Sequence, residues 1–165
     1  MLFRSMQGTG DMPEAWGNAN ALDLLRDMLV QERTDAPVTD ASKTTLHLLA
    51  GLPVEWIARI GETASVDRTP TTLGTVVSMK LTRTSPTAMH LEFDPGTRTT
   101  DTYVHVPLPD GMRLAEAKIN GRKIPGSAIT LSANGQQVIV AAGDVSERVV
   151  FDFTFAAGSQ NGVAR

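Results

Sequence analysis

The chain has 165 residues, enough for one domain with a hydrophobic core, and its 41% hydrophobic and 20% charged residues are typical of a globular protein. The formal net charge of −3 is too small to attract nucleic acid or an anionic membrane, so neither is expected as a partner. The absence of cysteine excludes disulfides, thiolate nucleophiles and cysteine-based zinc sites. With no apolar run of about 18 residues and no apolar leader, the sequence predicts neither a membrane span nor a signal peptide, and the cellular location stays open.

The first predicted element is an amphipathic helix over residues 19–32, which Asn18 or Asn20 would cap. Its apolar residues recur at three- and four-residue spacing on one face: Leu22, Leu25, Met28 and Leu29. A single helix can bury such a face only against another element or another chain. We therefore expect this face to contact a partner.

A polar segment follows at residues 33–45, rich in Thr, Asp and Ser around Pro37, and predicts an exposed, mobile loop. We place the domain boundary there, between residues 1–45 and residues 46–165. Beyond it, short runs that alternate apolar and polar residues predict half-buried strands joined by turns. The predicted strands are 46–49, 64–66, 76–81, 89–93, 103–106, 115–119, 129–131, 138–141 and 149–155.

The turn residues between these strands favour hairpins. Asn120-Gly121 predicts a type I′ turn, because both positions accept positive φ angles. Connections this short cannot contain the crossover helices that a parallel sheet needs. The predicted fold is therefore mainly β: an antiparallel β-sandwich preceded by one amphipathic α-helix.

Several phrases, taken in order, resemble the C-terminal end of the six-hairpin glycosidases, which are glycoside hydrolases with an α/α toroid catalytic domain. The phrases are MQGTGDMPEAWGNANALDLLRDMLVQE, LHLLAGLPVEWI and VDRTPTTLGTVVSMKL, with AKINGRKI in the sandwich that follows. In that superfamily, the last toroid helix, a crossing segment and a closing β-sandwich come in this order. The resemblance covers residues 6–81 by phrase and the remainder by pattern. It implies a fragment of a glycoside hydrolase that braces a toroid lying outside this sequence and is not catalytic alone.

Glycoside hydrolysis uses two carboxyl groups that face one bond, about 5 to 10 Å apart. Asp11 and Glu14 precede the predicted helix and are the candidate catalytic residues of a complete enzyme, since toroid loops at that end of the helices line the sugar cleft. The alternative is that they are ordinary acidic residues favoured by the helix dipole.

The runner-up function is an independent β-sandwich module that binds carbohydrate or protein. Its candidate binding residues are Trp16, Trp56 and Tyr103, because planar aromatic side chains stack on sugar rings. The competing interpretation places Trp56 in the joint between helix and sandwich and Trp16 against the helix. A third possibility is self-association through the apolar helix face.

The three histidines, His47, His90 and His105, all fall in predicted strands. Pairing of strand 89–93 with strand 103–106 would bring His90 and His105 together on the solvent face. Two histidines fall short of the three or four ligands that zinc requires, so we predict no metal site. The sequence has no nucleophile elbow, phosphate loop or dinucleotide fingerprint, and no cofactor is expected.

Overall fold

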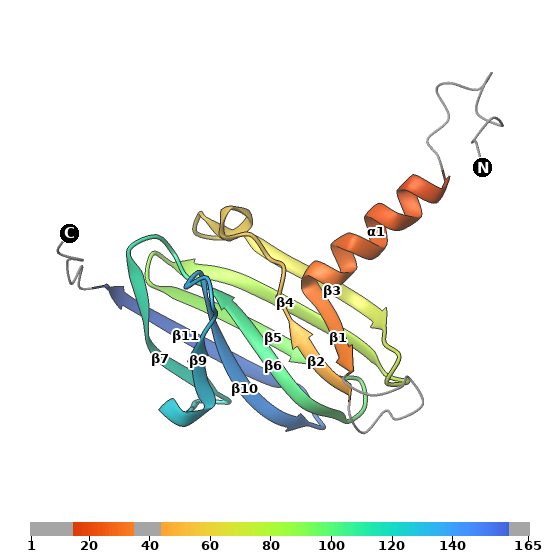
Figure 1. Ribbon diagram of the computed structural model, residues 1–165. Helices are drawn as coiled ribbons and strands as arrows, with labels where there is room; N and C mark the ends of the chain where they lie inside the picture. The colour runs from red at the N-terminus through yellow and green to blue at the C-terminus, as the bar shows by residue number, and fades with distance from the viewer. Residues whose placement is uncertain (1–14, 35–43, 159–165) are drawn as a thin grey trace, which may run out of the picture.

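The structure is a computed structural model that describes residues 15–34 and 44–158, with one α-helix standing at the end of two β-sheets (Figure 1). The described elements are α1 (Ala15–Leu29), β1 (Val30–Thr34), β2 (Thr44–Leu48), the 3-10 helix η3 (Val54–Ile57), β3 (Thr63–Pro70), β4 (Val76–Ser85), β5 (Ala88–Asp94), β6 (Thr99–Pro107), β7 (Met112–Ile119), β8 (Arg122–Lys123), the 3-10 helix η4 (Gly126–Ala128), β9 (Ile129–Leu131), β10 (Gln137–Val145) and β11 (Val149–Ala157). This confirms the prediction of a mainly β chain, a β-sandwich preceded by one helix. Among the described residues, no helix has the length and apolar character needed to cross a membrane.

The strands form two sheets. Sheet A has the order β1-β2-β6-β10-β9, and sheet B has the order β3-β4-β5-β11-β7-β8. All described pairs are antiparallel except β2 with β6, which is parallel. The chain leaves sheet A after β2, builds β3 to β5 in sheet B, and returns as β6. That excursion through the opposite sheet supplies the crossover a parallel pair needs, so the predicted antiparallel pairing holds for every described pair except this one.

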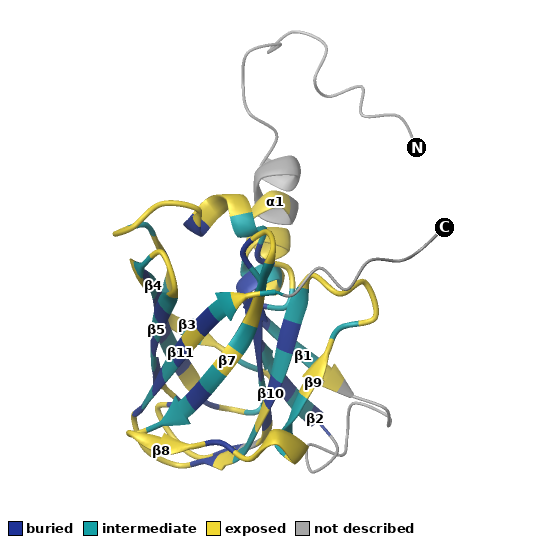
Figure 2. Cartoon of the chain, turned by 90° about the vertical axis from the view of Figure 1, so that its left-hand side faces the viewer, coloured by how far each residue is buried: buried dark blue, intermediate teal, exposed yellow. Residues whose placement is uncertain are grey.

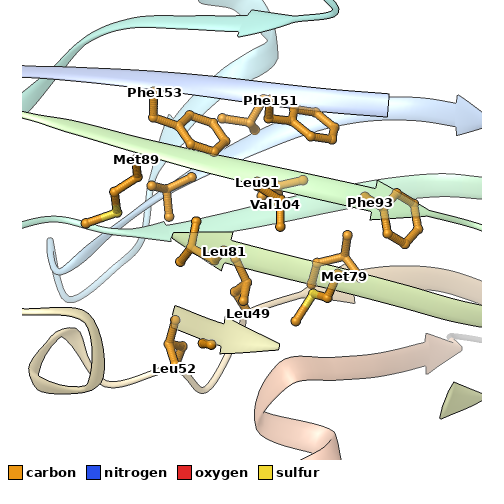
Figure 3. Packing of buried hydrophobic residues seen from close by; sticks show 14 of the residues in the cluster. Leu49, Leu52, Met79, Leu81, Met89, Leu91, Phe93, Val104, Phe151 and Phe153 are labelled. Carbon is orange, nitrogen blue, oxygen red and sulfur yellow. The ribbon is translucent and has the colours of Figure 1, made fainter. Parts of the chain in front are cut away.

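The core lies between the sheets and is made by the alternation seen in the sequence. Along β11, Val149, Phe151, Phe153 and Phe155 are buried, as predicted. Burial of a large apolar side chain away from water stabilises the fold by about 1.5 to 3 kcal/mol. Figure 3 shows this packing around Phe151 and Phe153, with Met89, Leu91 and Phe93 of β5, Met79 and Leu81 of β4, Val104 of β6, and Leu49 and Leu52.

The helix differs from its predicted bounds at both ends. It begins at Ala15, so Asn18 and Asn20 lie inside it and do not cap it. It ends at Leu29, because Val30 is fully buried and pairs with Leu48 as the first residue of β1. Burial in sheet A therefore overrides the helical periodicity of the sequence.

The predicted polar loop at residues 33–45 is shorter than expected. Its flanks, residues 33–34 and 44–45, pair with each other as the ends of β1 and β2, while residues 35–43 lie outside the described residues. The domain division at residue 45 stays a prediction. The pairing shows that residues 30–34 are hydrogen-bonded into sheet A.

The type I′ turn is confirmed. Asn120 and Gly121 have φ angles of 48° and 76°, and they connect β7 to β8. The turn is also fixed to β11: the Asn120 amide donates to the Val150 carbonyl at 2.8 Å, and the Val150 amide donates to Asn120 Oδ1 at 2.9 Å. Asn is favoured here because its short polar side chain tolerates positive φ.

Candidate functional site at the base of the helix

The C-terminal end of α1 is closed by the segment that follows β2. The last carbonyls of a helix have no partner within the helix. Here the Leu49 amide donates to the Leu29 carbonyl at 2.7 Å, and the Gly51 amide donates to the Met28 carbonyl at 2.9 Å. The phrase LLAG therefore caps the helix.

Gly51 lies directly against the last turn of α1. A Cβ atom added to Gly51 would lie 2.9 Å from both Cα and Cγ of Met28, closer than real Cβ contacts. Glycine permits this approach because it has no side chain. The helix base and the capping segment are thus in direct backbone contact.

A cluster of polar groups stabilises the other side of the joint, by which we mean the junction between α1 and the sandwich. Only 9% of the Glu32 side chain is exposed, and its carboxylate accepts hydrogen bonds from Arg26 at 3.2 Å, from the Thr72 hydroxyl at 2.8 Å and from the Leu73 amide at 3.2 Å. Arg26 also donates to the Pro70 carbonyl at 3.0 Å. A buried carboxylate needs such donors, and here they come from α1 and from the β3–β4 turn. The cluster ties these two elements together.

Beyond this joint, α1 extends away from the sandwich (Figures 1 and 2). Leu22, Leu24 and Leu25 are 66%, 64% and 44% exposed, and we name these three residues the open leucines; at about 100° per residue, Leu24 lies roughly 160° around the helix from Leu22, so they do not share one face. The predicted face is therefore divided. Leu29 is buried in the sandwich and Met28 is half-buried, so neither belongs to the open part. Leu24 is not part of the predicted face, because it lies off the helical stripe that contains Leu22 and Leu25.

The predicted aromatic residues do not form a common platform in the described structure. Trp56 lies on η3 and is 45% exposed, so the interpretation that it fills the joint was wrong. Tyr103 lies on β6, half-buried, with its ring stacked on His47 at a centroid distance of 5.0 Å. Trp16 is in α1, but its side chain lies outside the described part of the chain, as do Asp11 and Glu14 entirely.

A polar hollow of about 390 Å³ lies next to the capping segment. One wall is formed by residues 50–55, and the other by the β6–β7 and β9–β10 connections. Its polar side chains are Glu55, Asp110, Asn134, Gln136 and Gln137. Nothing in the local sequence pattern predicts this hollow, because its walls come from three separate connections.

The histidines are arranged differently from the prediction. His90 is on β5 in sheet B, whereas His105 is on β6 in sheet A, so they are not paired. His90 Nδ1 lies 2.7 Å from Asp152 Oδ1. His105 is buried, not exposed, and its Nε2 lies 2.8 Å from Nδ1 of His47 on β2.

Both members of this histidine pair are held in the neutral form. Burial, reinforced by the positive charge of Arg33 and by His105, lowers the pKa of His47 from 6.5 to about 4. Burial and Arg33 likewise lower the pKa of His105, against a hydrogen bond with Gln137 that raises it. Among the described residues, no group of three or more His, Asp or Glu side chains is placed to hold a metal ion.

Comparisons of the chain with protein-family models, with curated proteins and with solved structures find no match.

Proposed function

We propose that this chain is a C-terminal accessory domain of a glycoside hydrolase, in which the sandwich holds the last helix of an α/α toroid and braces the toroid through it. One observation carries the proposal: α1 is fixed at its base while its three open leucines are not covered by the sandwich. The resemblance of its sequence phrases to six-hairpin glycosidases supplies the class of partner.

The energetics favour a helical partner. An isolated helix of 15 residues is marginal in water, so α1 needs packing along its length to be stable. Burying one leucine side chain contributes about 1.5 to 3 kcal/mol, and α1 offers three open leucines. Neighbouring helices in a toroid would lie on more than one side of α1, and their ridges and grooves would cover leucines that point in different directions.

If this proposal holds, the domain has no glycosidase activity by itself. The pure chain should fold and should not hydrolyse aryl glycosides, because two facing carboxyl groups have to be completed by the toroid. Turnover by the pure chain that disappears in Glu14→Gln would overturn the proposal. Asp11→Asn tests the second candidate carboxyl group in the same assay.

A second experiment tests the partner. We would read the coding DNA upstream of Met1 and measure the intact mass of the native polypeptide. An in-frame helical toroid, together with a native mass several times that of this chain, supports the proposal. A native polypeptide that begins at Met1, with no such toroid, would remove the toroid as partner.

A second candidate function is an independent carbohydrate-binding module, and the exposure of Trp56 favours it. Trp56 directly follows Glu55, which lines the polar hollow, although Trp56 itself is not a lining residue; an exposed ring to stack on a sugar and polar groups to bind its hydroxyls are both what such a module needs. Retention on polysaccharide gels that is lost in Trp56→Ala, but kept in Tyr103→Phe, would support this module. No retention on a panel of glycans would count against it.

A further inference from the structure

A line of hydrogen bonds crosses the outer face of sheet A and ends at the capping segment of α1. Thr45 Oγ1 lies 3.0 Å from His47 Nε2, and His47 Nδ1 lies 2.8 Å from His105 Nε2. His105 is hydrogen-bonded to the side chain of Gln137. Gln137 Nε2 donates to the carbonyl of Ala50 at 3.2 Å. The line therefore joins β2, β6 and β10 to the residue between the two capping amides.

The donor and acceptor roles along this line of hydrogen bonds follow from the Ala50 carbonyl at its end and from the hydrogen bond between Gln137 and His105. The Ala50 carbonyl can only accept, so the amide nitrogen of Gln137 faces it, and the hydrogen bond that raises the pKa of His105 is one in which the ring donates to the amide oxygen. His105 then donates to Gln137 and accepts from His47 through Nε2. His47 in turn donates from Nδ1 and accepts at Nε2 from the Thr45 hydroxyl. Every donor points towards Ala50, with both rings neutral.

Ala50 connects this line to the helix. Its neighbours Leu49 and Gly51 donate the two amides that close the C-terminal end of α1, at 2.7 Å and 2.9 Å. Movement of Gln137 away from the Ala50 carbonyl would release one of the contacts that fix this segment. The helix base is thus coupled to the state of the histidine pair.

The line can take up one proton but not two. A first proton at His47 Nε2 needs only a rotation of the Thr45 hydroxyl towards the Arg33 carbonyl, 3.3 Å away. A second proton puts hydrogen atoms on both facing nitrogens, and two N–H groups cannot remain 2.8 Å apart. The doubly protonated pair must separate, which displaces His105 relative to Gln137.

The surroundings oppose protonation. The pair is faced by Arg33 from β1 and by Tyr103 from β6, with Gln137, Ser132 and Asn134 next to His105 from β10 and the β9–β10 turn. Among these described groups none is a carboxylate, so no anion stabilises a charged ring. A charge on the pair is therefore not stabilised in place, and the two rings and their hydrogen-bond partners have to move.

We propose that the histidine pair is an acid-sensitive latch: at neutral pH it holds the capping segment against α1, and when both rings are protonated it separates, which loosens that segment and widens the range of directions of the helix. This inference goes beyond the proposed function, because it concerns how the helix is held and not what the helix binds. It remains testable if the glycosidase proposal fails.

The absence of cysteine makes the test direct. Asp23→Cys in α1 and Ser146→Cys in the β10–β11 turn are both at exposed positions, and each takes one spin label in the full chain. Pulsed electron paramagnetic resonance then gives the distribution of distances between helix and sandwich. We expect a narrow distribution at about pH 7 and still at about pH 4, where the pair carries at most one proton, and a broad one only in stronger acid, where the second proton binds, with the strand signal in circular dichroism retained.

Three variants separate the latch from general acid unfolding. His105→Gln removes a titrating ring and should keep the distribution narrow in acid. Gln137→Ala removes the link to Ala50 and should broaden the distribution already at neutral pH. His90→Gln changes the histidine of the other sheet and should behave like the parent chain. A narrow distribution for the parent chain in acid strong enough to protonate both rings, or the same acid broadening in His105→Gln, would overturn the latch, and His47→Gln takes the place of His105→Gln if that variant fails to fold.

Discussion

Gly51→Ala tests whether α1 is held by direct contact with the capping segment. The added Cβ would lie 2.9 Å from Cα and Cγ of Met28, whereas ordinary contacts begin at 3.4 Å, so one side must move by about half an ångström. Such overpacking costs about 1 to 3 kcal/mol. The same shift stretches the hydrogen bond from the Gly51 amide to the Met28 carbonyl, which is worth about 0.5 to 1.5 kcal/mol. We expect a total loss of about 1.5 to 4.5 kcal/mol.

The helix can also detach from the sandwich. The loss of stability is then limited to the free energy with which the helix packs against the sandwich. Urea unfolding followed by circular dichroism distinguishes the two cases: either the midpoint falls, or the helical signal disappears while the strand transition keeps its midpoint. Gly126→Ala is the matched control, because a Cβ there meets no atom within 4 Å. The control should be unchanged or more stable by about 0.4 to 1 kcal/mol. If Gly51→Ala keeps both its helical signal and its midpoint, the contact described above does not hold the helix.

Three further predictions concern the core, the open leucines and the histidine pair. Phe153→Ala should lower the unfolding free energy by about 3 to 5 kcal/mol in urea, because the side chain is fully buried, and a loss under about 1 kcal/mol would contradict that burial. Replacing Leu22, Leu24 and Leu25 together by Ser should change stability by no more than about 0.5 kcal/mol per site and leave a monomer in light scattering; a large loss would mean that the sandwich already covers them. Burial lowers the pKa of His47 from 6.5 to about 4, so the unfolded chain binds the proton first and stability should fall as pH decreases from about 6.5 to 4, then level off. After allowance for solvent screening of a partly exposed ring, the loss is about 1 to 2 kcal/mol, and a His47→Gln chain with the same pH profile would refute it.

The strands could be predicted because their residues alternate. In β5 and β11, every second side chain is apolar and buried, which is a local property of the sequence. β1 was missed because VQE also continues the helical stripe, and only its pairing with β2 makes it a strand. The parallel pairing of β2 with β6 depends on which sheet each strand enters, and alternation carries no such information.

The site at the helix base was less predictable than the fold. The amphipathic face was visible, but Leu29 proved to be buried and Leu24 exposed, since the direction of the helix decides which leucines the sandwich covers. The contact between His47 and His105 joins residues 58 positions apart in the chain. Gly51 carried no signal of its close approach to α1, because a glycine in a loop is expected on turn grounds alone.

Leu49 shows that the fold maintains the direction of α1 at a cost. Its φ angle is 65°, a region that L-residues other than glycine and asparagine avoid by about 1 to 2 kcal/mol. Glycine would remove that strain, but it would also leave a hole, because the Leu49 side chain is fully buried in the core cluster that includes Leu81 and Met79 (Figure 3). The same residue donates the amide that closes the helix at Leu29. A helix that served only as a flexible tether would need none of these constraints, whereas one that presents three leucines to a partner at a defined angle needs all of them.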